Sequence, residues 1–108
     1  NICAVYAHND DMAVGAIQAI KEAGLKPGTD IKVVSIDAVP DIFKAMAAGE
    51  ANATVELTPN MAGPAFDALD AYLKDKKEPK KWIQTESKLY TASDDPMKVY
   101  EAKKGLGY

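Results

Sequence analysis

The sequence predicts an α/β fold, built as an open parallel sheet with helices on both of its faces. Apolar, β-branched segments recur at residues 2–7, 31–36 and 53–57, and a stretch with helical spacing of apolar residues follows each of them. Strands that alternate with helices are joined by right-handed crossovers, which make the sheet parallel. With 108 residues, of which 47% are hydrophobic, the chain is long enough for one small domain with a single core.

The first strand is expected before a change from apolar to polar residues, and the first helix after it. Every side chain in residues 2–7 is apolar or aromatic, which predicts a strand buried on both faces and a buried thiol at Cys3, the single cysteine. Polar residues follow, and Asp10 among them is expected to cap a helix. Apolar residues then recur at helical spacing from Met12, and Gly24 ends the helix.

The second and third strands are separated by a short helix. Residues 31–36 are rich in β-branched side chains and predict a strand. Pro40 falls where a first helical position would be, so residues 41–48 are expected to form a helix. A third strand is expected at residues 53–57.

The last third of the sequence predicts two further helices. The first covers about residues 59–74, and Pro64 within it is expected to delay its start or to kink it. A lysine-rich run at residues 74–81 is interpreted as a solvated turn. Residues 83–91 are expected to be extended, and residues 94–104 to form the final helix.

Composition and targeting signals exclude several classes of function. The formal net charge is −3, and all thirteen basic residues are lysines, which argues against a nucleic-acid partner because such interfaces collect arginine. No apolar stretch approaches the roughly 18 residues of a membrane span. The chain opens on Asn1 and leads almost directly into an apolar run, which we interpret as a cut end.

Candidate ligand-binding residues follow the strands, because the crevice of an open parallel sheet lies beyond the carboxyl ends of its strands. These positions hold Asn9 after the first strand and Asp37 after the second, and both side chains can hydrogen-bond to hydroxyl groups. A Ser35, His8 and Asp37 triad lacks the Gly-x-Ser-x-Gly turn and is rejected. No metal-ligand spacing and no phosphate-binding glycine motif is present, so we expect no catalytic residue, metal or cofactor.

Three segments of the chain resemble a known family. Residues 6–16, 34–41 and 53–59 look like the C-terminal portion of the periplasmic monosaccharide-binding proteins of ABC importers. Residues 56–64 and 105–108 look closest to the galactofuranose-binding branch, which is related to the ribose and glucose/galactose-binding proteins. The resemblance implies a partial Rossmann-like lobe of the type I periplasmic binding protein fold.

The resemblance also implies roles for individual residues. In the family, the residues corresponding to Asn9 and Asp37 hydrogen-bond sugar hydroxyls, and Asp10 matches a helix-capping Asp. Leu57 and Thr58 would lie at the hinge or beside the site. Leu57 departs from the family, which often carries Gln or Asn at that strand end, and this argues against ribose or glucose/galactose specificity.

The implied organisation divides the chain into three parts. Residues 1–57 would belong to the C-terminal lobe, residues 58–86 would cross into the other lobe, and residues 87–108 would return and form the terminal helix. The implied function is the periplasmic, exported substrate-binding component of a sugar ABC transporter, with a monosaccharide and the permease subunits as partners. The alternative is the sugar-sensing effector domain of a LacI-type transcription regulator. A fragment of this kind is expected to carry half a site and to self-associate.

Overall fold

The computed structural model describes residues 1–106, and it divides the chain into two compact units. Unit 1 consists of Asn1–Leu57 together with the chain from Lys88 onward, and unit 2 consists of Thr58–Ser87. Whether the units belong to different lobes of a larger protein stays a prediction.

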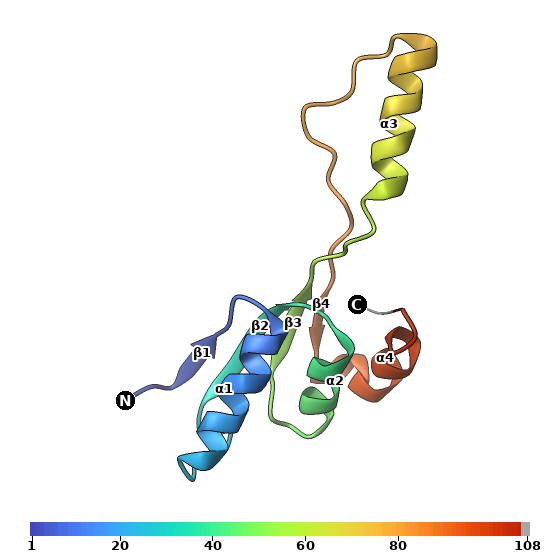
Figure 1. Cartoon of the computed structure of the whole chain (residues 1–108). Coiled ribbons are helices and arrows are strands. Elements are labelled where there is room, and N and C mark those ends of the chain that lie inside the picture. Colours follow the sequence, from blue (N-terminus) through green and yellow to red (C-terminus); the bar gives the residue numbers. More distant parts are fainter. Residues whose placement is uncertain (107–108) are drawn as a thin grey trace. The chain divides into compact units, whose positions relative to one another are not determined.

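Unit 1 is a four-stranded sheet with three α-helices and a short 3₁₀ helix (Figure 1). Its elements are β1 (Ala4–Tyr6), α1 (Asp10–Glu22), β2 (Lys32–Asp37), α2 (Pro40–Ala47), β3 (Ala53–Glu56), β4 (Leu89–Thr91), η1 (Ala92–Asp94) and α4 (Pro96–Lys103). Strands β1, β2 and β3 and helices α1 and α2 therefore form where the hydrophobic pattern predicts them.

The sheet is mixed, with the strand order β1-β2-β3-β4. Strands β1, β2 and β3 are parallel, as predicted, and Val34 of β2 pairs with Tyr6 of β1 on one side and with Ala53 of β3 on the other. Strand β4 is antiparallel to β3, with Val55 opposite Leu89. The all-parallel prediction is wrong for this one edge strand.

Helices cover only one face of the sheet among the described residues, so the expectation of helices on both faces is not met. Helix α2 packs against both α1 and α4, which places all three in one layer. The consecutive strand order explains this for α1 and α2, because right-handed crossovers between parallel strands that are added in one direction place their helices on the same side. On the opposite face, Tyr6, Val55 and Leu89 are exposed. Cys3 is also exposed, contrary to expectation.

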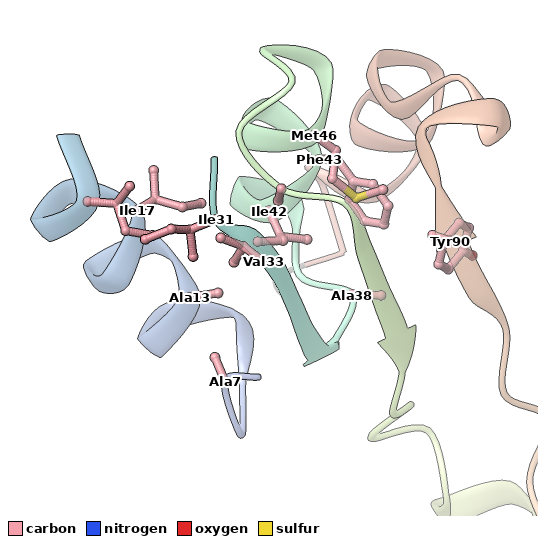
Figure 2. Packing of buried hydrophobic residues seen from close by; sticks show 12 residues of the cluster. Ala7, Ala13, Ile17, Ile31, Val33, Ala38, Ile42, Phe43, Met46 and Tyr90 are labelled. Atoms are coloured by element: carbon pink, nitrogen blue, oxygen red, sulfur yellow. The ribbon is translucent and has the colours of Figure 1, made fainter. Parts of the chain in front are cut away.

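The core lies between this helix layer and the covered face of the sheet (Figure 2). Helix α2 contributes Ile42, Phe43 and Met46 to this core, and helix α1 contributes Ala13, Ile17 and Ile20. The Phe43 ring meets the edge of the Tyr90 ring of β4 at 5.1 Å between centroids. The antiparallel strand is thus tied into the same core as the parallel ones.

Unit 2 contains helix α3 (Ala62–Asp75), whose residues are all at least partly exposed. The helix begins at Ala62 rather than near residue 59, and Pro64 lies in its first turn, where a missing backbone donor costs little. The structure therefore confirms that the helix starts later than residue 59, as predicted from Pro64. Residues 76–87 after the helix form no regular element. None of the helices described in residues 1–106 has the length and apolar character needed to cross a bilayer.

Candidate functional site at the ends of β1 and β2

Asn9 occupies the turn that joins β1 to α1, and it is the N-cap of that helix. Its backbone is extended, with φ −150° and ψ 172°, and its Oδ1 atom accepts a 2.9 Å hydrogen bond from the Met12 backbone N–H. The prediction that Asp10 caps the helix is therefore wrong, because the cap lies one residue earlier. This bond fixes the Asn9 amide, and among residues 1–106 its Nδ2 group has no hydrogen-bond partner.

Asp10 is instead a buried acceptor that joins three elements. Its side chain is fully buried, and its Oδ1 atom accepts hydrogen bonds from Ser35 Oγ of β2 at 2.5 Å and from Thr54 Oγ1 of β3 at 2.8 Å. Its Oδ2 atom accepts a 2.8 Å bond from the Val39 backbone N–H. The start of α1 is thereby linked to two strands and to the connection that follows β2.

Asp37 ends β2 in an unusual backbone conformation. Its φ is 116° and that of Ala38 is 63°, so two consecutive residues other than glycine have positive φ. Such conformations are sparsely populated and persist only where the surrounding structure holds them. The Ala38 N–H donates to Thr54 Oγ1 at 3.3 Å, and the Asp37 carbonyl accepts from the Leu57 N–H at 3.4 Å.

The Asp37 carboxylate lies in an unfavourable electrostatic environment. Burial raises the pKa of Asp37 above its ordinary value, and the nearby negative charges of Asp10 and Asp11 raise it further. Within residues 1–106 no side chain or backbone group donates a hydrogen bond to this carboxylate. The group therefore has unused acceptor capacity at the carboxyl end of β2.

Leu57 and Thr58 lie where the chain passes from unit 1 to unit 2. Leu57 follows β3 directly, and its side chain is 57% exposed. Thr58 Oγ1 accepts a hydrogen bond from the Asn60 N–H at 3.2 Å, so it caps a local turn within unit 2. The hinge or site-adjacent role predicted for these two residues stays a prediction.

The arrangement fits recognition of hydroxyl groups rather than chemistry. An amide that can donate follows β1 and a carboxylate that can accept follows the neighbouring parallel strand β2. Ser35 is buried, so its hydroxyl group is out of reach of a substrate. Among the described residues, no group of three or more His, Cys, Asp and Glu side chains is arranged to hold a metal ion.

Sequence reasoning missed the polar network behind the site. Ser35 and Thr54 are direct partners in the β2–β3 register and are both buried. A signal for them exists in the sequence, since each hydroxyl residue lies between two apolar residues of a predicted strand, and a buried hydroxyl needs a partner. That the partner is Asp10, 25 residues before Ser35, follows only from the folded structure.

Comparison with known proteins settles the family. The family model described as periplasmic binding protein domain matches residues 1–78. The chain belongs to this family. The match runs through β1, β2, β3 and α3, and so includes both strand ends that carry the candidate site.

Relatives of this periplasmic binding protein domain are sugar-binding proteins. The galactofuranose-binding protein YtfQ of Escherichia coli is 67% identical over the whole chain, which covers 34% of that relative. The ribose import binding protein RbsB of Escherichia coli is 37% identical over 78 residues, covering 71% of this chain and 25% of the relative. The chain thus spans about a third of the length of the curated relatives it matches.

Solved structures agree in fold. A crystal structure of a galactofuranose binding protein matches with a TM-score of 0.90 and 67% identity, over 100% of this chain and 36% of the other. The periplasmic binding protein of the arabinose ABC transporter from Shewanella, bound to L-arabinofuranose, matches with a TM-score of 0.87 and 58% identity, over 96% of this chain and 34% of the other. These relatives are binding proteins rather than enzymes, and they favour the transport receptor over the transcription regulator.

Proposed function

We propose that this chain supplies one side of the monosaccharide site in the substrate-binding component of a sugar ABC transporter. The observation that carries the proposal is the pair of hydrogen-bonding side chains, Asn9 and Asp37, at the carboxyl ends of two adjacent parallel strands. The identity of 67% over the whole chain with a galactofuranose-binding protein supports the same conclusion. The proposal includes no catalytic step.

In this proposal the two side chains have complementary roles. The Asn9 Nδ2 group donates to a sugar oxygen, because its Oδ1 atom is already engaged by the Met12 N–H. The Asp37 carboxylate accepts from sugar hydroxyls, and such charge-assisted bonds are short and strong. Because the chain spans about a third of its relatives, the other contacts to the sugar would come from outside these residues.

We propose a furanose ring form as the ligand. Two relatives are named for furanose sugars, galactofuranose and L-arabinofuranose. Leu57, at the end of β3, offers an apolar and exposed side chain where a polar one would reach for a further hydroxyl group. The proposed ligand therefore presents no hydroxyl group that needs a hydrogen-bonding side chain at the end of β3.

Calorimetry on the natural full-length polypeptide that carries this sequence tests the proposal. We expect methyl β-D-galactofuranoside to bind more tightly than methyl β-D-galactopyranoside. The Asp37→Ala variant should lose detectable binding, whereas Asp41→Ala, which removes an exposed carboxylate from α2, should bind normally. Normal binding by Asp37→Ala would show that the site is wrongly assigned.

The transport role requires export and a membrane partner. We propose that the protein works in the periplasm and passes its sugar to the permease subunits of an ABC importer, as a member of a family of periplasmic binding proteins. Recovery of the natural polypeptide in the fluid released by osmotic shock is the expected result. Retention in the cytoplasmic fraction would contradict it.

The 108-residue chain on its own is expected to self-associate. The uncovered face of its sheet presents Tyr6, Val55 and Leu89, which are 58%, 39% and 57% exposed. Sedimentation at increasing concentration should show dimers or larger species, and Val55→Lys, which places a charge on this face, should reduce them. A clean monomer at high concentration would contradict the expectation.

A further inference from the structure

The buried pair formed by Asp10 and Thr54 lies directly behind the backbone that carries Asp37. Thr54 Oγ1 donates to Asp10 Oδ1 at 2.8 Å, and both side chains are fully buried. Together they accept hydrogen bonds from the two backbone N–H groups that follow Asp37. Ala38 donates to Thr54 Oγ1 at 3.3 Å, and Val39 donates to Asp10 Oδ2 at 2.8 Å.

These two N–H groups belong to the segment of the site whose backbone has positive φ angles. The φ angles of Asp37 and Ala38 are 116° and 63°, a region that residues with a side chain rarely adopt. The Ala38 methyl group is fully buried in the hydrophobic core (Figure 2), which restrains the segment further. The segment is thus held by the bonds to Thr54 and Asp10, by the weaker bond from the Leu57 N–H to the Asp37 carbonyl oxygen, and by the burial of Ala38.

We propose that Asp10 and Thr54 are positioning residues for sugar binding: they hold the left-handed backbone at Asp37 and Ala38, and so fix the direction of the Asp37 carboxylate. The inference rests on the proposed function, and it names the residues that orient Asp37, the main sugar-binding residue of that proposal. Neither Asp10 nor Thr54 touches the sugar, because both side chains are fully buried.

The electrostatics support a functional reason for this arrangement. A second carboxylate near Asp37 is costly for the free protein, since burial raises the pKa of Asp37 and the charges of Asp10 and Asp11 raise it further. A neutral acceptor in place of Asp10 would hold the Val39 N–H without adding a negative charge near Asp37. The Asp10 carboxylate accepts hydrogen bonds from the hydroxyl groups of Ser35 and Thr54 and from the Val39 N–H, and of these donors Thr54 and Val39 connect it to the segment that follows Asp37.

Three conservative variants separate positioning from general stabilisation. Thr54→Val keeps the shape of the side chain but removes the acceptor for the Ala38 N–H. Thr54→Ser keeps the hydroxyl group. Ser35→Ala is the matched control, because it also removes one buried hydroxyl donor from Asp10 Oδ1, but the Ser35 side chain makes no hydrogen bond to Ala38 or Val39 in the described structure.

The first measurement is amide hydrogen exchange on the 108-residue chain. We expect the Ala38 N–H to exchange at least tenfold faster in Thr54→Val, relative to core amides such as that of Val33, and to keep its protection in Thr54→Ser and Ser35→Ala. Equal acceleration in Thr54→Val and Ser35→Ala would mean that Thr54 stabilises the fold in general, and would overturn the proposal.

The second measurement is the affinity of the natural full-length polypeptide for methyl β-D-galactofuranoside. Thr54→Val should weaken binding at least tenfold, while Thr54→Ser and Ser35→Ala stay within about threefold of the unmodified protein. Asp10→Ala should weaken binding at least as much as Thr54→Val. If Asp10→Ala does not fold, the Thr54 variants decide.

The outcomes distinguish this inference from the proposed function. Loss of binding in Asp37→Ala with normal binding in Thr54→Val would overturn the positioning role and leave the proposed site intact. Normal binding in Asp37→Ala, or no binding of the furanoside by the unmodified protein, would overturn the proposed site and the positioning role with it. Loss of binding in both variants, with Ser35→Ala unaffected, is the result that supports both.

Discussion

At the residue scale, the Asp37 carboxylate is held where folding alone would not place it. It is partly buried, two negative charges lie near it, and its backbone φ is 116°. Each of these features raises the free energy of the native state. A residue that destabilises the free protein in several ways at once is typical of a ligand-binding position, since bound ligand offsets the cost.

The variant Asp37→Asn is therefore expected to unfold at a higher temperature than the natural chain at pH 7. The pKa of Asp37 is raised in the native state, so the native protein binds more protons than the unfolded chain between the unfolded pKa of 3.8 and the raised value. The free energy of unfolding consequently falls as the pH rises through that interval and stays lower above it. Asn removes this charge and tolerates positive φ.

Thermal unfolding monitored by circular dichroism at several pH values checks this prediction. The gain of Asp37→Asn should shrink as the pH is lowered towards about 4. Asp41→Asn is the matched control, because Asp41 lies in the first turn of α2 and pairs with Lys44, so its removal should give no gain at any pH. A lower unfolding temperature for Asp37→Asn at pH 7 would contradict the argument.

Gly28 marks a close approach between two loops and is expected to tolerate no side chain. It has φ +76°, and a Cβ atom placed on it would lie 2.0 Å from the Gly49 carbonyl oxygen. Gly28→Ala should lower the free energy of unfolding by about 2–4 kcal/mol through strain and displacement of the loop. Gly24→Ala, with φ +75° and open space around it, should cost only about 1 kcal/mol. Urea titration of both variants measures the difference, and equal costs would rule out the clash.

At the element scale, helix α4 is fastened to the sheet by one buried lysine. Lys103 is 7% exposed, and its ammonium group pairs with Glu56 of β3 at 2.7 Å and lies 5.9 Å from the centre of the Tyr90 ring. The next residue, Lys104, pairs with Glu101 on the exposed side of the same helix. The two neighbouring lysines therefore make ion pairs in opposite environments.

We expect Lys103→Met to lower the free energy of unfolding by about 3 kcal/mol, the lower end of the cost of breaking a buried ion pair from one side, because Glu56 is partly exposed. Lys104→Met should leave the unfolding temperature almost unchanged, since exposed ion pairs contribute little. Denaturant titration of the two variants gives both values. A similar loss in both would mean that α4 is held by its helical propensity rather than by its contact with β3.

Some strands and helices can be predicted from the sequence, and others cannot. The strand–helix alternation of β1 to β3 follows from hydrophobic periodicity, which the folded core uses directly. The direction of β4 does not, because it depends on where the chain returns after unit 2. The roles of Asn9 and Asp10 are also beyond local patterns: both residue types cap helices well, and only the hydroxyl groups of Ser35 and Thr54 decide which one is buried.

At the scale of the whole molecule, unit 1 is complete without unit 2. Every residue of the hydrophobic core lies in residues 1–57 or after residue 87, and none of residues 58–87 is buried. The two segments of unit 1 also meet next to unit 2: the Glu56 N–H donates to the Lys88 carbonyl oxygen at 2.8 Å, directly after the paired residues Val55 and Leu89. Unit 2 is therefore an insertion between two hydrogen-bonded strands.

Replacing residues 58–86 by Asn-Gly should consequently leave unit 1 folded. A two-residue Asn-Gly turn suits an antiparallel pair, and a shorter loop lowers the entropy cost of closure by about 2 kcal/mol at most, so the unfolding temperature should stay equal or rise. The amide spectrum of the remaining residues should overlay that of the natural chain. Truncation before Pro96 is the control, because it removes α4 from α2 and should unfold the unit. Loss of the native spectrum in the Asn-Gly variant would mean that unit 2 is needed to fold the sheet.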